Sequence, residues 1–328
     1  MPRRSTFLLA LRAALGARGV CLVDVGARGG LQPRWRELAD LLDVVAFEPD
    51  AEEASRLQAT FAGARSAIVV PAAVWADDDE RTLHLTRSAG CSSLFEPDGE
   101  VLRSFPDPDR WEVTSDVPLR TTTLDRALAS VSAPPADFLK IDVQGGALPV
   151  LEGGAATLGS VAGVEVEVEL LSLYRGEPLF GEVDAFLRAA GFELIDLRPT
   201  YWRRRTTQHV AGTKGQIAFA DALYFVRPEV LAERAPDAAL AAVAGASIYG
   251  LYDRVVLYAG DREGPMGDLA RLAARPSTIG RIPEFRYRYL VGHLLKDAGD
   301  ALLTSRRTWA VAEQHLGNRP RHPRFPWR

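Results

Sequence analysis

The feature that most constrains the fold is an apolar run that ends in a glycine-rich turn. The run Val20–Val25 is followed by glycines at positions 26, 29 and 30, and Pro33 opens a stretch whose apolar residues recur at helical spacing. This order predicts a strand, a tight loop and a helix. In an open α/β sheet such a loop lies at the carboxyl ends of the strands, where ligands bind, and glycine lets the backbone approach a ligand closely.

The acidic residue in this loop indicates the kind of ligand. The segment from Asp24 reads Asp-x-Gly-x-x-Gly and lacks the first glycine of the dinucleotide-binding pattern. A carboxylate at Asp24 would repel a pyrophosphate, but it can pair with an ammonium group. We therefore expect a cofactor that carries an amine and a cation. The alternative is a structural carboxylate that accepts hydrogen bonds from its own loop.

A second acidic residue follows the next expected strand, Val44–Phe47. Glu48 lies 22 residues after Gly26, close to the roughly 20-residue offset at which an acidic side chain meets ribose hydroxyls in such folds. A carboxylate can accept hydrogen bonds from both hydroxyls. Each signal alone is common, but the two in this order predict a cofactor that contains a ribose.

Strands and helices alternate along the first 228 residues. This alternation predicts a doubly wound, mainly parallel sheet. Residues 87–118 are rich in glycine, proline and serine, and we expect a long irregular loop of functional importance there. Further along, the last two strands are expected at 192–197 and 223–226, joined by a loop over 199–221 that closes over the acceptor.

Composition narrows the class of protein. Hydrophobic residues make up 47% and charged residues 25% of the 328 residues, and the net charge of −4 provides no overall attraction to nucleic acid. The two cysteines cannot form a disulfide framework or a zinc site, and Cys21 in a buried strand fits a reduced thiol. We expect a cytoplasmic protein without a metal. No apolar stretch approaches the roughly 20 residues that span a bilayer.

The two ends of the chain differ in character from the middle. The start contains Arg3-Arg4, but Arg12 interrupts the apolar stretch that a twin-arginine signal would need, so an amphipathic helix with Phe7 and Leu11 inward is expected. Residues 229–328 are rich in alanine, leucine and arginine. We therefore expect two parts, a domain over 1–228 and a helical extension over 229–328, through which a homo-oligomer would assemble.

Five segments resemble, in order and spacing, the FkbM-type S-adenosylmethionine-dependent methyltransferases. They are Val23-Asp-Val-Gly-Ala27, Ala46-Phe-Glu-Pro49, Pro71-Ala-Ala-Val74, Ser92-Ser-Leu94 and Leu139-Lys-Ile-Asp-Val-x-Gly145. The resemblance covers roughly residues 20–227. It implies an α/β fold of the class I methyltransferase (Rossmann-like) type. That fold is a mainly parallel seven-stranded sheet with helices on both faces and an antiparallel last hairpin, here followed by the C-terminal helical extension.

The resemblance also implies an activity. Relatives use S-adenosyl-L-methionine to methylate a hydroxyl of a sugar, a glycan or a small natural product. It assigns the cofactor to Asp24, Gly26, Ala27, Arg28, Gly29, Glu48, Pro49, Ala73, Val74, Asp142 and Gln144, and it includes Ser92 and Ser93, which we expect at the acceptor. From the chemistry of their side chains, Tyr174, Trp202 and Arg203 are further candidates for binding the acceptor. Aromatic rings stack on sugar faces and arginine binds carboxylates or phosphates, although a solvated basic loop is the alternative for residues 203–205.

Three residues are candidates for the catalytic base. Asp142 ends the strand beside the first one, Glu169 ends a strand on which glutamates alternate, and His209 has a side chain that titrates near neutral pH. The glutamates are explained equally well as a polar strand face that the C-terminal helices cover. A lone histidine on a loop, such as His209, more often has no catalytic role. We favour Asp142 narrowly, because the fold determines its position.

Two departures from the family pattern leave alternatives open. The family usually reads Asp-Val-Glu-Gly-x-Glu where this chain has Gln144 and Ala147 in place of the two glutamates. A cofactor-binding partner with impaired catalysis, assembling through its C-terminal region, is therefore the alternative to an enzyme. A nucleotide-binding oxidoreductase is a third class, which Asp24 argues against.

Overall fold

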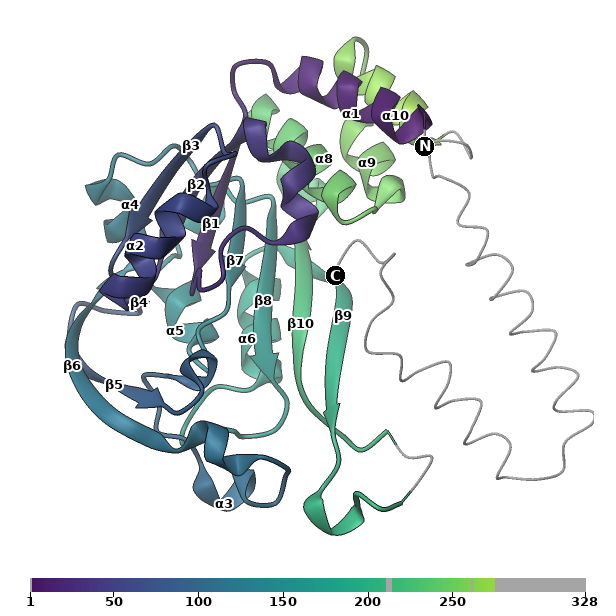
Figure 1. Cartoon of the computed structure of the whole chain (residues 1–328). Coiled ribbons are helices and arrows are strands. Elements are labelled where there is room, and N and C mark those ends of the chain that lie inside the picture. The colour runs from purple at the N-terminus through teal and green to yellow at the C-terminus, as the bar shows by residue number, and fades with distance from the viewer. Residues whose placement is uncertain (1, 211–213, 261, 275–328) are drawn as a thin grey trace, which may run out of the picture.

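The computed structural model describes residues 2–210, 214–260 and 262–274 (Figure 1). Its centre is a seven-stranded sheet with the order β3-β2-β1-β7-β8-β10-β9. The strands are β1 (Val20–Val25), β2 (Leu42–Phe47), β3 (Ser66–Val70), β7 (Phe138–Ile141), β8 (Gly163–Glu169), β9 (Phe192–Trp202) and β10 (Gln216–Val226). From β3 to β8 neighbouring strands are parallel, and β10 is antiparallel to both β8 and β9. The expected class I methyltransferase sheet with an antiparallel last hairpin is confirmed.

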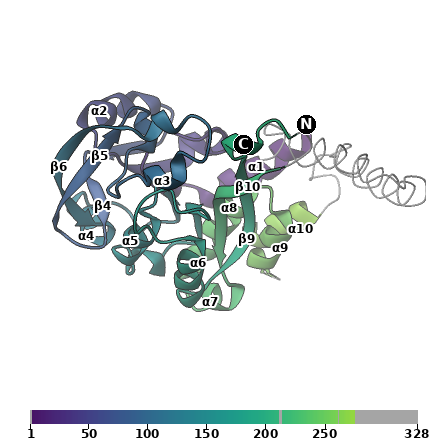
Figure 2. The same cartoon turned by 90° about the horizontal axis from the view of Figure 1, so that it is seen from below.

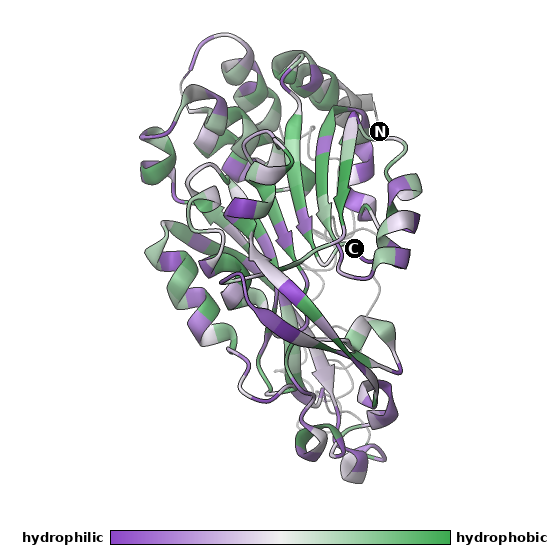
Figure 3. Cartoon of the chain, turned by 90° about the vertical axis from the view of Figure 1, so that its left-hand side faces the viewer, coloured by the Kyte–Doolittle hydropathy of each residue, from purple (hydrophilic) through white to green (hydrophobic). Residues whose placement is uncertain are grey.

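Helices cover both faces of this sheet (Figures 1 and 2). The helices of the first part are α1 (Pro2–Leu15), η1 (Pro33–Leu41), α2 (Ala51–Thr60), α3 (Gly99–Leu102), α4 (Leu124–Ser130), α5 (Ala147–Glu152) and α6 (Phe180–Ala189), with short 3-10 turns η2 (Ala89–Cys91), η3 (Pro108–Trp111), η4 (Thr157–Gly159) and η5 (Arg205–Thr207). The stretch after Pro33 is a 3-10 helix that ends at Leu41, directly before Leu42 pairs with Val20 in the sheet. Strand interiors are apolar, and Figure 3 shows hydrophilic bands toward the carboxyl ends of the strands.

Two expected loops are shorter than the sequence indicated. Residues 113–123 form β6 (Val113–Thr123), which pairs with β5 (Glu80–Thr86) and β4 (Ala73–Trp75) in a second sheet, so the irregular region after residue 87 ends at 112. The loop expected over 199–221 is reduced to residues 203–215, because β9 and β10 continue as a paired ribbon to Trp202 and Gln216. β6 carries polar residues and Pro118 at exposed positions, and β9 contains Pro199, so the apolar alternation that marks a strand is weak in both.

The helices after residue 227 pack onto the first part of the chain. They are α7 (Pro228–Ala232), α8 (Pro236–Ile248), α9 (Tyr252–Ala259) and α10 (Pro265–Ala274). Rings of Trp35, Phe138 and Tyr249 pack together on one face of the sheet, with Gly245 of α8 close to Phe138. A helical start to the extension is therefore present, and residues 275–328 lie outside the described part. The division near residue 228 stays a prediction.

The N-terminal helix and the cysteines match their expected environments. Phe7 and Leu11 of α1 are buried, and α1 packs against α8 and α10. Cys21 and Cys91 are both buried and free. Over the described ranges, no helix combines the length and the apolar character that crossing a membrane requires.

Candidate active site

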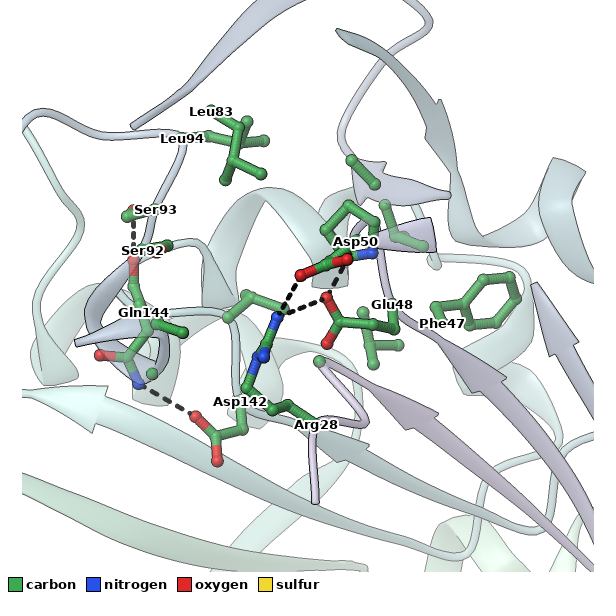
Figure 4. Close-up of a pocket in the computed structure, with 18 of the residues that line it drawn as sticks. Arg28, Phe47, Glu48, Asp50, Leu83, Ser92, Ser93, Leu94, Asp142 and Gln144 are labelled. Atoms are coloured by element: carbon green, nitrogen blue, oxygen red, sulfur yellow. Dashed lines mark hydrogen bonds and ion pairs between the residues drawn. The ribbon is translucent and has the colours of Figure 1, made fainter. Parts of the chain in front are cut away.

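A cavity of about 330 Å³ opens at the carboxyl ends of β1, β2 and β7 (Figure 4). Its wall comes from the turns after these strands, from β4, from β5 and from the segment 89–94. Such a position, outside the carboxyl ends of a parallel sheet, is where open α/β folds bind ligands. The volume is at the lower end of the range for small-molecule sites.

The turn after β1 is held tightly between its neighbours. The N–H groups of Gly26 and Ala27 both donate to the carbonyl oxygen of Phe47, at 3.0 and 3.1 Å. Gly26 has a φ of +78°, and a Cβ on it would overlap the carbonyl oxygen of Asp142. Glycine is therefore required at this position by the close approach of the β1 and β7 turns, in addition to the conformational reason.

Glu48 presents a buried carboxylate to the cavity. It is 4% exposed, and its Oε1 accepts hydrogen bonds from the N–H of Asp50 at 3.1 Å and from Nη2 of Arg28 at 3.5 Å. The same arginine nitrogen lies 3.0 Å from Oδ2 of Asp50 (Figure 4). Burial raises the pKa of Glu48, although the Asp50 N–H and the Arg28 charge oppose the shift. This end of the cavity thus offers an acceptor for hydroxyl groups beside a guanidinium.

Asp24 is placed differently from the expectation. It is 2% exposed and does not line the cavity, and its Oδ1 lies 3.0 Å from Nζ of Lys140 on the neighbouring strand. The ammonium group that pairs with Asp24 is therefore that of Lys140. Burial lowers the pKa of Lys140, but the charges of Asp24 and Asp142 outweigh it, so that the pKa ends above its ordinary value. A direct contact between Asp24 and a cofactor stays a prediction, without support from this geometry.

Two carboxylates in the cavity are joined by one amide. Nε2 of Gln144 donates to Oδ1 of Asp142 at 3.1 Å and to Oε1 of Glu167 at 2.7 Å, and all three residues line the cavity. The backbone of Gln144 is fixed as well, because its carbonyl oxygen accepts a hydrogen bond from Oγ of Ser93 at 2.6 Å. Its φ of 51° is left-handed, a conformation that costs a side-chain-bearing residue roughly 1–3 kcal/mol and is concentrated at functional sites.

Glu167 was not among the residues assigned from the sequence. Burial raises its pKa well above the ordinary range, and the charges of Asp142 and Glu169 add to the shift. The alternation of glutamates along β8 was the available signal, but the sequence could not tell which of them faces the cavity. A carboxylate with a raised pKa in a cleft is a candidate for proton transfer.

The other two glutamates of β8 are closed off from the cavity. Glu169 is 2% exposed and accepts a hydrogen bond from the N–H of Gly145 at 2.9 Å. Glu165 pairs with Arg34 and accepts a hydrogen bond from the hydroxyl of Tyr249. This strand face is therefore covered by η1 and by the end of α8 at Glu165 but opens to the cavity at Glu167, so neither interpretation of the sequence describes all of it.

The residues expected around the acceptor do not all lie in one cavity. Ser92 and Ser93 line the cavity. Tyr174 is fully buried behind it, with its hydroxyl 3.1 Å from Oε1 of Gln144. Trp202 and Arg203 line a second cavity, of about 360 Å³, and the exposed His209 lines neither of these two cavities.

Most of the residues assigned to the cofactor come together in the first cavity. Those that line it are Gly26, Arg28, Glu48, Pro49, Ala73, Val74, Asp142 and Gln144, whereas Asp24, Ala27 and Gly29 do not. The second sheet adds apolar residues that the sequence reading missed, including Leu83 and Leu85 of β5. No local motif marks them, because only the tertiary structure brings β5 to this cavity.

The chemistry of this cavity fits a methionine-derived nucleoside cofactor. Glu48 can accept ribose hydroxyl hydrogen bonds, Val74 and Leu83 provide an apolar wall for a base, and Asp142 provides negative charge for a cationic group. Within the described residues, no group of three or more His, Cys, Asp or Glu side chains has an arrangement that could hold a metal ion.

Fold and cavity together are those of a class I methyltransferase. The chain belongs to the FkbM methyltransferase family, since the methyltransferase FkbM domain model matches residues 24–194. Its methyl donor is accordingly S-adenosylmethionine.

Solved structures of other methyltransferases were also found to be similar. A TehB-like S-adenosylmethionine-dependent methyltransferase from Corynebacterium glutamicum is 11% identical, with 67% of this chain and 88% of that chain covered and a TM-score of 0.29. The magnesium protoporphyrin IX methyltransferase from Synechocystis PCC 6803 is 9% identical over 68% and 77%, with a TM-score of 0.31. The 23S rRNA methyltransferase ErmE is 12% identical over 82% and 96%, with a TM-score of 0.30. No curated protein sequence matches, so the assignment depends on the family match and the strand order.

Proposed function

We propose that the protein is an O-methyltransferase that transfers the methyl group of S-adenosylmethionine to a hydroxyl of a sugar, a glycan or a small natural product. The observation that supports this best is the pair of carboxylates, Asp142 and Glu167, held by Gln144 in the wall of the cofactor cavity. A hydroxyl is a weak nucleophile until its proton is removed, and a carboxylate pair beside the reacting centre provides an acceptor for that proton.

The cofactor supplies an electrophilic methyl group on a sulfonium ion. The residues of the cavity have three tasks around it. Glu48 would accept the ribose hydroxyl hydrogen bonds, while the charge of Arg28 opposes the rise in the pKa of this carboxyl group. The close β1 and β7 turns would determine where the donor and the acceptor meet, which is the main contribution of a protein to a direct displacement. Asp142 would orient the hydroxyl.

Glu167 is the residue that we propose as the base. Its raised pKa makes it a stronger proton acceptor than an ordinary carboxylate, and proton transfer is most efficient when the pKa lies near the working pH. Asp142 contributes to that shift through its negative charge. The proposal replaces Asp142, the first choice from the sequence, by its neighbour in the same hydrogen-bonded group.

The experiment is a pH profile of single-turnover methylation, after a screen of hydroxyl acceptors with labelled S-adenosylmethionine. With Glu167 as the base, the rate rises with pH through a pKa above the ordinary range for glutamate, and Glu167→Gln removes most of the activity. Asp142→Asn should shift the rise to lower pH, because a charge that raises the pKa of Glu167 is gone. His209→Ala is the control and should keep the wild-type profile.

Two outcomes would contradict Glu167 as the base, and a third would contradict the enzymatic activity. A rate that is flat above about pH 5 in the wild type would point to a carboxylate with an ordinary pKa. Loss of activity in His209→Ala alone would identify the histidine as the base. If S-adenosylhomocysteine binds but no acceptor is methylated, the replacement of the family carboxylates by Gln144 and Ala147 favours a cofactor-binding partner with impaired catalysis.

A further inference from the structure

The second cavity is lined by the end of β9, by η3 with the residues before it, and by Arg203 and Gln208. Figure 1 shows that the β9–β10 ribbon extends beyond the carboxyl edge of the main sheet. The cavity has a volume of about 360 Å³. Its wall contains three aromatic residues, two arginines, an amide, a proline and one carboxylate. They are Trp111, Tyr201, Trp202, Arg110, Arg203, Gln208, Pro106 and Asp107. An open cavity lined in this way combines flat apolar surfaces with cationic hydrogen-bond donors.

The wall carries two positive charges, Arg110 and Arg203, against one carboxylate, Asp107. Across the part of the chain that the structure describes, neither Arg110 nor Arg203 forms an ion pair with a carboxylate. Nη2 of Arg110 lies 3.8 Å from Sγ of Cys91, a weak contact, and Nη1 of Arg203 donates to the carbonyl oxygen of Val210 at 3.3 Å. Other surface arginines do pair with acids, as Arg175 does with Glu96 at 3.2 Å. Most of the donors on both guanidinium groups therefore remain available to a ligand.

The aromatic residues of this cavity are held in place from behind. The ring of Trp202 lies 5.3 Å from that of Trp111, 5.5 Å from that of Phe105 and 5.8 Å from that of Phe219, measured between centroids. Trp111 is 8% exposed. A ligand that packs against these rings meets a preformed surface, so little side-chain freedom is lost on binding.

The segment 88–92 links the two cavities. Gly90 and Ser92 line the cofactor cavity, whereas the side chain of Cys91 packs in a cluster with Trp111. On the other side, the N–H of Ser88 donates to the carbonyl oxygen of Arg110 at 3.0 Å. A molecule with one end in the cofactor cavity therefore has the second cavity as its neighbour across a single short segment.

We propose that the second cavity binds an anionic sugar unit of the methyl acceptor. Arg110 and Arg203 would pair with its carboxylate or phosphate, the aromatic residues would pack against the ring, and Gln208 would bind hydroxyl groups. Arginine is suited to both anions because its planar donors match their oxygens. The inference rests on the proposed function, and it adds the charge and the class of the acceptor.

The test is the binding of four probes to the full chain, measured by ligand-observed NMR: glucose, glucuronate, glucose 6-phosphate and inorganic phosphate. Both acidic sugars, or one of them, should bind roughly tenfold or more tightly than glucose, because charge-assisted hydrogen bonds are added. The preferred sugar shows whether carboxylate or phosphate is recognised. The double variant Arg110→Gln/Arg203→Gln should lose this preference, and the matched control Arg126→Gln, at an exposed arginine of α4, should keep it.

Three results would overturn the inference. They are equal binding of glucose and its acidic forms, a preference that survives in the double variant, and inorganic phosphate binding as tightly as glucose 6-phosphate. Binding of S-adenosylhomocysteine should be unchanged in the double variant, which also shows that this variant is folded. If the acidic sugars bind as expected but no hydroxyl of any acceptor is methylated, the proposed function fails and the sugar site stands.

Discussion

Gln144 is the residue on which the arrangement of the candidate site depends most. It stands where the family usually has a glutamate, and its amide donates to Asp142 and Glu167 at the same time. A glutamate here would place a third negative charge against these two carboxylates, whereas an amide donor stabilises their ionised forms. With Glu167 as the base that we propose, the departure from the family pattern does not by itself remove the chemistry.

Glu48 provides the first test at this scale. Glu48→Gln should weaken binding of S-adenosylhomocysteine by about 1–3 kcal/mol, because two ribose hydrogen bonds lose a charged acceptor in a buried position. Isothermal titration calorimetry measures the change. Glu52→Gln, on the neighbouring α2 and exposed, is the matched control and should bind as the wild type does. Equal affinities of the two variants would remove Glu48 from the cofactor site.

Glu177 provides a test of pH dependence. It is 7% exposed, its Oε1 accepts from the N–H groups of Leu173 and Tyr174, and its Oε2 has no hydrogen-bond partner among the described residues. Burial raises its pKa from 4.5 to about 7, although these N–H groups oppose the shift. A raised pKa means that the folded state favours the protonated form. The contribution of Glu177 to the free energy of unfolding is therefore complete below about pH 4.5 and is lost as the pH rises through about 7.

We expect the free energy of unfolding of the wild type to fall between pH 5 and pH 8 by up to roughly 3 kcal/mol from this group. Glu177→Gln should remove that fall and be the more stable protein at pH 8. Urea unfolding at the two pH values measures it, with Glu96→Gln, an exposed glutamate, as the control that keeps the wild-type slope. If the free energy of unfolding of Glu177→Gln falls with pH as steeply as that of the wild type, the titration belongs to another group, and Glu169 is the next candidate.

At the scale of elements, the β9–β10 ribbon is the clearest difference between expectation and structure. The strands pair as far as Gln216 and Trp202, with a register shift between Ile217 and Phe219. The ribbon extends beyond the edge of the sheet (Figure 1) and carries Tyr201 and Trp202 of the second cavity, where Trp202 packs against Trp111 of η3. A loop over the same residues would not hold Trp202 against Trp111.

Hydrogen exchange should show the ribbon directly. Backbone amides that are paired in residues 199–202 and 216–221 should be protected, and amides of 204–209, which lie outside the strands, should exchange faster. The paired segment 192–197 is the internal reference, because it lies in the main sheet. Rapid exchange throughout 199–221 would contradict the paired ribbon and favour the long loop that the sequence indicated.

At the scale of the whole molecule, one buried group of side chains joins the two parts of the chain. Arg34 of η1 forms an ion pair with Glu165 of β8, and the hydroxyl of Tyr249, at the end of α8, donates to the same carboxylate. Arg34 and Glu165 are almost inaccessible to solvent. The first part of the chain and the C-terminal helices are therefore coupled through the Glu165 carboxylate, because leaving this buried charge unpaired would cost several kcal/mol.

Arg34→Met should lower the free energy of unfolding by about 3–5 kcal/mol, because Glu165 is left as an uncompensated buried charge. The double variant Arg34→Met/Glu165→Leu should recover most of this loss. Urea unfolding of the three proteins measures the coupling, and Arg175→Met, which breaks a surface pair with Glu96, should cost about 1 kcal/mol or less. A double variant no more stable than Arg34→Met would show that the ion pair itself holds the parts together.

The sequence alone determined the sheet, the edge at which the candidate cavity opens and much of the lining of that cavity. The β1 turn, Glu48 and Asp142 could be predicted because each depends on local order, namely an apolar run followed by a glycine or an acidic residue. Only the tertiary structure decided that Asp24 pairs with Lys140, that Glu167 faces the cavity in place of Glu169, and that β6 and the long ribbon form. Such features depend on side chains and strands brought together from distant parts of the chain, and the spacing of residues along a single segment carries no information about those pairings.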